Sequence, residues 1–159
     1  MLTPSAFAIT FVLVVVFGYF AHRSLHQPWT GKFNQAHMTH HNLLYPNGDF
    51  FAETYRDPGK DNTVVIFGLF SIPVLLLPII LQLSGTISLS LMSFVLIEML
   101  GLGFLHNYLH DAFHITNHWL TRFSLYRKWV ALHIRHHRDQ QKNFGIFTFM
   151  MDRLMGTFK

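Results

Sequence analysis

The sequence predicts an all-α integral membrane protein, with about three transmembrane helices and a helical cap on the cytosolic side. Three observations lead to this fold class. First, 50% of the residues are hydrophobic and only 13% are charged, about half the charged share of an ordinary soluble domain. Second, three long stretches are almost free of charge. Third, all twelve histidines lie outside those stretches.

The three apolar stretches cover residues 2–21, 63–82 and 86–105. Each has the roughly 20 residues that a helix needs to cross a bilayer. The first stretch lacks a basic start and a small-residue cleavage site, so we expect a retained anchor rather than a secretory signal. The second and third are so close together that they should form an antiparallel hairpin. Pro73 and Pro78 should kink the first helix of that hairpin.

Basic residues indicate the orientation, because cytoplasmic flanks of spanning helices collect Lys and Arg. All twelve lie either between the first and second stretches or after the third. This predicts that the cap, residues 22–62 and 106–159, faces the cytosol from a bacterial inner membrane or the endoplasmic reticulum. A basic rim against anionic headgroups explains the formal net charge of +4, so we expect no nucleic acid partner. No repeat or linker divides the chain, which predicts one domain over residues 1–159.

The histidines form four clusters with spacings of mostly three and four residues. They are His22 and His26; His37, His40 and His41; His106, His110, His114 and His118; and His133, His136 and His137. Such spacings place two imidazoles on one helix face, where both can reach a single ion. The three predicted spans bring all four clusters to one side of the membrane. So many ligands exceed the four of a structural zinc site and predict a site for two metal ions.

The metal and its surroundings are only partly predictable. Imidazole binds Zn, Cu, Fe and Ni alike, but redox iron explains the number of ligands best. Cys is absent, which excludes thiolate ligands. Acidic residues of the cap could accept the second N–H of ligating imidazoles, and we favour Asp111 and Asp152 for this role. The others are expected at the solvated surface: Asp49, Glu53, Asp57, Asp61 and Asp139.

These motifs resemble the fatty acid hydroxylase/sterol desaturase superfamily of membrane di-iron enzymes. The matching motifs are H-R-S-L-H at 22–26, H-M-T-H-H at 37–41 with Tyr45-Pro46 after it, H-D-A-F-H at 110–114, H-I-R-H-H at 133–137, and N-F-G followed by M-D-R-L-M-G-T at 143–157. The resemblance implies ten metal ligands: His22, His26, His37, His40, His41, His110, His114, His133, His136 and His137. In the third cluster, His106/His110 and His114/His118 have the same spacing as His110/His114. We choose His110/His114 because an aromatic and basic stretch follows it, as is frequent in the superfamily.

The resemblance also implies the activity. Two iron ions would use O2 to hydroxylate or desaturate a C–H bond of a fatty acyl chain or sterol, and zinc could occupy the same sites in the protein as isolated. We expect a separate electron donor, ferredoxin-, rubredoxin- or cytochrome b5-like, and an acidic donor would suit the positive cap. The short chain is closer in length to bacterial carotenoid ring hydroxylases, which are an alternative. The eleven-residue step from His26 to His37 and the Tyr-Pro pair favour the fatty acid hydroxylases.

A His-rich membrane metal transporter or metal-binding protein is the alternative from another functional class. Transporters place ionisable ligands near the middle of the membrane. Glu98 is the one ionisable residue within the three predicted spans. A transporter or storage protein would also leave the motif at 143–157 unexplained.

Overall fold

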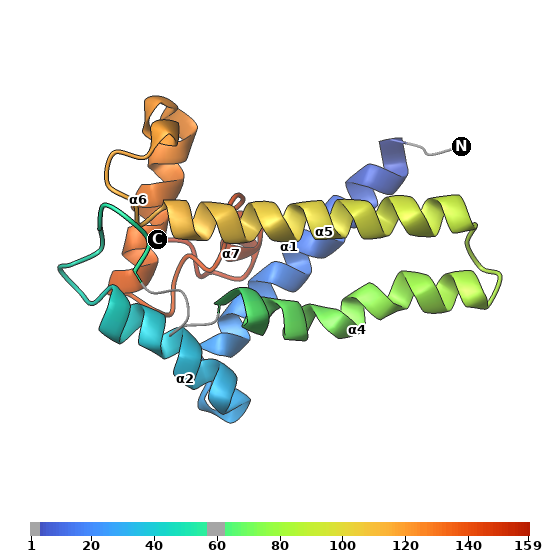
Figure 1. The fold of residues 1–159 in the computed structure, drawn as a ribbon, viewed down its shortest axis with the longest axis horizontal. Coiled ribbons are helices and arrows are strands. Elements are labelled where there is room, and N and C mark those ends of the chain that lie inside the picture. Colours follow the sequence, from blue (N-terminus) through green and yellow to red (C-terminus); the bar gives the residue numbers. More distant parts are fainter. Residues whose placement is uncertain (1–3, 57–62) are drawn as a thin grey trace.

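The computed structural model describes residues 4–56 and 63–159, and the described chain is helical (Figure 1). One isolated bridge joins Ala52 and Ile115. The predicted candidates Asp57 and Asp61, the basic residue Lys60 and the first residues of the 2–21 stretch lie outside the described residues. In chain order the elements are α1 (Pro4–Leu25), η1 (Pro28–Thr30), α2 (Lys32–Thr39), η2 (His40–Leu44), α4 (Thr63–Leu83), α5 (Leu89–Ala112), η3 (Trp119–Arg122), α6 (Ser124–Arg138) and α7 (Met150–Leu154).

The three predicted apolar helices form as α1, α4 and α5. Of the described residues, α1 and α5 are long and apolar enough to cross a membrane. The apolar part of α4, Ser71–Leu83, is shorter than these two helices. A third span therefore remains a prediction. Both α1 and α5 continue past the end of their apolar stretch. His22, His106 and His110 accordingly lie on these long helices, just beyond the ends of the predicted apolar stretches.

The predicted antiparallel hairpin is formed by α4 and α5, which lie side by side (Figure 1). At the end of α4 the Thr86 N–H donates to the Leu81 carbonyl at 2.9 Å and the Gly85 N–H to the Gln82 carbonyl at 3.0 Å. This is the Schellman pattern, which needs a left-handed residue after the helix. Gly85 supplies it with φ +75°. Ser88 then caps α5 by accepting the Leu91 N–H, so the chain reverses within a few residues.

The cap elements gather at the end of the long helices opposite the α4–α5 turn (Figure 1). Two apolar clusters attach them. Leu109 and Phe113 of the α5 end pack with Tyr126 of α6 and with Ile146. Tyr19 of α1 packs with Phe144 and Met151 of the C-terminal segment. The α4–α5 turn and the start of α1 lie at one end, and α2 and α6, which carry histidine motifs, lie at the other, as predicted.

Candidate metal centre

Nine of the ten predicted ligands lie in two groups of buried histidines. The five-histidine group is His22, His26, His37, His41 and His136. The four-histidine group is His40, His114, His133 and His137. In each group one ligand atom per residue lies within 4.8 Å of all the others. Each H-x-x-H-H motif is shared: the residues four apart go to one group and the middle histidine goes to the other.

The Nε2 atoms converge in both groups. Nε2 of His26 lies 2.9 Å from Nε2 of His37 and 3.1 Å from Nε2 of His136. In the other group, Nε2 of His133 and Nε2 of His114 are 3.0 Å apart. Two imidazole nitrogens bound at about 2.1 Å to one ion and at right angles are about 3.0 Å apart. The spacing therefore matches nitrogens that share an ion.

Backbone carbonyls orient several of these rings from the opposite side. Each accepts a hydrogen bond from an Nδ1 atom: Phe144 from His22 at 2.7 Å, Lys142 from His136 at 2.7 Å, Phe50 from His114 at 2.8 Å and Tyr45 from His137 at 3.3 Å. Because a carbonyl only accepts, Nδ1 must carry the proton in each ring. Nε2 then keeps the lone pair that a metal needs.

The two favoured aspartates have different roles. Asp111 Oδ1 lies 3.5 Å from His110 Nδ1 but forms no hydrogen bond with it, so the expected partnership is not formed. For Asp152 the prediction was wrong, because its carboxylate accepts the Phe144 N–H at 2.8 Å, the Gly145 N–H at 2.9 Å and the Thr157 hydroxyl at 2.8 Å. Asp152 therefore affects the imidazoles indirectly: it holds the segment whose Phe144 carbonyl orients His22.

The third sequence cluster is divided among several places. His114 joins the four-histidine group, and the His110 ring lies beside that group, 4.5 Å from the His40 ring and 4.9 Å from the His133 ring between centroids. A ligand role for His110 remains a prediction. His118 is outside both groups, since its Nδ1 accepts the Leu120 N–H and its Nε2 faces the Tyr108 hydroxyl. His106 lies near Phe147, on the membrane side of the centre.

Burial keeps these imidazoles in the neutral form that binds metals. Desolvation lowers the pKa of His26 to about 4 and that of His137 to about 3. Burial first, and the charges of neighbouring imidazoles second, hold the pKa far below the ordinary value at the other cap histidines of the two groups. These are His37, His40, His41, His114, His133 and His136.

Comparison with known families identifies the relationship. A family model described as "Fatty acid hydroxylase" matches residues 7–157, which is nearly the whole chain. The chain belongs to the fatty acid hydroxylase family. The resemblance read from the motifs is therefore confirmed. Neither the curated proteins nor the solved structures compared with the chain gave a match.

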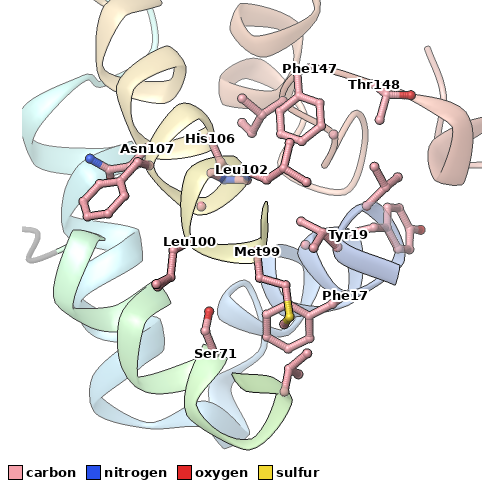
Figure 2. A pocket seen from close by; sticks show the side chains of 18 of the residues that line it. Phe17, Tyr19, Ser71, Met99, Leu100, Leu102, His106, Asn107, Phe147 and Thr148 are labelled. Carbon is pink, nitrogen blue, oxygen red and sulfur yellow. The ribbon is translucent and has the colours of Figure 1, made fainter. Parts of the chain in front are cut away.

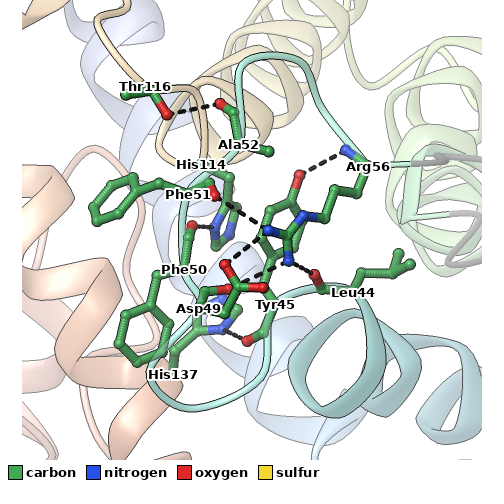
Figure 3. A network of polar contacts seen from close by, with 10 residues as sticks. All are labelled: Leu44, Tyr45, Asp49, Phe50, Phe51, Ala52, Arg56, His114, Thr116 and His137. Atoms are coloured by element: carbon green, nitrogen blue, oxygen red, sulfur yellow. Dashed lines mark hydrogen bonds and ion pairs between the residues drawn. The ribbon is translucent and has the colours of Figure 1, made fainter.

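In this family member the segment after η2 lies against His114 and His137 of the four-histidine group (Figure 3). The buried Tyr45 ring stacks on the His114 ring with centroids 3.8 Å apart. Arg56 holds this segment in place. Its backbone N–H donates to the Tyr45 hydroxyl at 2.7 Å, and its guanidinium donates to the Leu44 carbonyl at 2.6 Å and pairs with Asp49 at 2.7 Å. Sequence reasoning treated Tyr45 as a family marker and missed Arg56. The position of Arg56 near the second motif was the only available signal.

An apolar cavity of about 230 Å³ lies between the long helices of this fatty acid hydroxylase family member (Figure 2). Its walls come from α1, α4, α5 and residues 144–151. Phe144 and His106 line the cavity. The Phe144 ring also lies 5.4 Å from the His136 ring and 5.7 Å from the His22 ring between centroids. The cavity therefore ends beside the five-histidine group.

Proposed function

We propose that this fatty acid hydroxylase family member is a membrane-bound di-iron oxidoreductase. It would use O2 and external electrons to hydroxylate or desaturate a C–H bond of a lipid. The observation that carries the proposal is the pair of adjacent, buried imidazole groups within one family member. Hydroxylation converts the C–H bond, O2, two electrons and two protons into an alcohol and one water molecule. Desaturation removes two hydrogen atoms and produces an alkene and two water molecules.

The residues present fit two metal ions. The five-histidine group would hold one ion, and the four-histidine group with His110 would hold the other. Among the described residues, Nε2 of His110 and Nε2 of His137 are buried without a hydrogen-bond partner. A buried nitrogen lone pair without a partner is costly, and a metal ion would satisfy it. When bound, iron supplies the reduction of O2 and the oxidation of the C–H bond, while the protein binds, orients and excludes water.

A membrane location is supported by the surface of the long helices. None of the residues in the most apolar part of α5 is buried, and Ile97 on this helix is 71% exposed. A helix that is apolar and uncovered in this way suits lipid contact better than the core of a soluble protein. The Lys and Arg residues outside the predicted spans support our proposal that the cap faces the cytosol. We retain a bacterial inner membrane or the endoplasmic reticulum as the location.

We propose that the electron donor docks on the outward face of α6. The inward face of this helix carries His133, His136 and His137, which are buried. The outward face carries four exposed basic residues, Arg127, Lys128, Arg135 and Arg138, and α6 has no acidic residue. An acidic ferredoxin-, rubredoxin- or cytochrome b5-like protein would be attracted to this face. Electrons would then cross a single helix to reach the histidine groups.

The test combines metal analysis and lipid chemistry. The full chain is produced in a host lacking it, with iron supplied, and lipids are extracted after growth under ¹⁸O2. We expect two iron ions per purified chain and a lipid alcohol carrying ¹⁸O, or an alkene without it. Chain-dependent products should disappear when His137 is replaced by Ala. One ion per chain, or lipids that are identical with and without the chain, would contradict the proposal.

A further inference from the structure

We infer that the cavity between α1, α4 and α5 binds one unbranched acyl chain, and that Gly18 and Gly103 limit how much of the chain it accepts. The inference rests on the proposed function, because it names the substrate class of the same site. It also selects among the fatty acyl, sterol and carotenoid substrates that sequence reasoning left open.

The position of the cavity supports a lipid tail as the occupant. Its walls are mainly aliphatic and aromatic side chains of helices that suit a bilayer, such as Met99, Leu102 and Phe17 (Figure 2). The histidine end is marked by Phe144 and His106. A chain entering between the helices would therefore bring its inner section towards the imidazoles and leave the rest among apolar side chains.

The size of the cavity favours a slender occupant. Its volume of about 230 Å³ lies below the roughly 300–1,000 Å³ of sites that enclose a whole drug-sized ligand. A section of an unbranched acyl chain occupies little volume, whereas the fused rings of a sterol or the substituted ring of a carotenoid occupy more. The small volume therefore favours an acyl chain.

Four glycines line this space, and three of them come from the long helices, one from each: Gly18 of α1, Gly68 of α4 and Gly103 of α5. A Cβ atom built at any of these three meets no heavy atom within 4 Å. Helix packing therefore does not require glycine at these positions. Glycine is also unfavourable inside a helix relative to other residues. Open space for a ligand accounts for its use at three places around one cavity.

The test replaces Gly18 or Gly103 by Leu in the full chain. Gly101→Leu is the matched control, because Gly101 lies on α5, also has no neighbour within 4 Å of a built Cβ, and does not line the cavity. Saturated fatty acids of increasing length compete with a fluorescent polyene fatty acid for the purified protein. Each methylene group buried should improve affinity about fourfold until the cavity is filled.

We expect wild type and Gly101→Leu to share one length limit. In Gly18→Leu and Gly103→Leu the limit should fall by about two methylene groups, so that longer chains bind roughly fifteenfold more weakly than to wild type. The corresponding Ala variants should shift the limit less, and they serve as the test if a Leu variant fails to fold. A sterol should not displace the probe.

Equal length limits in all variants, or displacement by a sterol as strong as by a fatty acid, would overturn the inference. The proposed function would survive that result if wild type still binds two iron ions and oxidises a lipid. Conversely, a shifted limit in a protein that oxidises no lipid would refute the proposed function and leave the acyl-chain site standing.

Discussion

Asp152→Asn should weaken the metal centre although Asp152 is not expected to touch a metal. The fully buried carboxylate accepts the N–H groups of Phe144 and Gly145 and the Thr157 hydroxyl. Asparagine keeps one oxygen, but its NH2 group would face one of these donors. One charge-assisted hydrogen bond is lost and a buried N–H is left without an acceptor, which together cost about 2–4 kcal/mol. The apparent melting temperature should fall by on the order of 10 °C.

The same change should reduce iron binding at the five-histidine group. Phe144, held by Asp152, supplies the carbonyl that orients His22, and loss of such an outer contact weakens metal affinity about 10–100-fold. Iron titration and thermal unfolding of purified protein measure both effects. Asp139→Asn is the control, because Asp139 forms an ion pair with Lys159 at the surface, where such pairs contribute at most about 1 kcal/mol. Equal stability and equal iron affinity in the two variants would refute this reasoning.

Three further predictions concern the ligands, the topology and the donor. Replacement of a ligand by Ala should abolish lipid oxidation while the chain stays in the membrane, and His118→Ala should be milder; the ligands to test are His40, His41, His136 and His137. Cys is absent from the sequence, so Ser84→Cys and Lys128→Cys each introduce a single thiol. A label should reach the first thiol from one side of the membrane and the second from the other side. Labelling of both from the same side would require another number of spans. Lys128→Glu should slow reduction by an acidic donor protein most at low salt, whereas an unchanged rate and salt dependence would place the donor elsewhere.

Sequence reasoning predicted the parts of the molecule that depend on side-chain type and spacing. Apolar length predicted the helices α1, α4 and α5, and the short connection at Ser84–Gly85 predicted their hairpin. Spacings of three and four predicted the clusters, but they did not predict that within each H-x-x-H-H motif the residues four apart share a group, as His37 and His41 do in one and His133 and His137 in the other. The ends of the helices were harder to predict from the sequence. Hydropathy detects where α5 leaves the apolar stretch, but the helical hydrogen bonds continue to Ala112, because no Pro or Gly interrupts them after Gly103.

Sequence reasoning could not identify the partners of the imidazoles. We looked for carboxylates, because they are visible as residue types, but Asp111 lies 3.5 Å from His110 Nδ1 without a hydrogen bond and Asp152 bonds elsewhere. The partners are mostly main-chain carbonyls, at Tyr45, Phe50, Lys142 and Phe144. Every residue carries a carbonyl, so residue type gives no sign of which ones face a histidine. The cavity was hidden for the same reason, since its glycines are informative only once three helices are seen to surround one space.

These carbonyls explain why segments without ligands belong to the metal centre. The carbonyls of Tyr45 and Phe50 orient two rings of the four-histidine group, and Arg56 holds their segment by bonds to Leu44 and to Tyr45. The carbonyl of Phe144 orients a ring of the five-histidine group, and Asp152 holds its segment. Each group is thus supported by a loop that a buried or partly buried charged side chain fixes in place. Gly145 is needed there because a Cβ atom would collide with the Thr148 carbonyl. The motif at 143–157 therefore supports the candidate metal site, and its residues 144–151 also form one wall of the cavity.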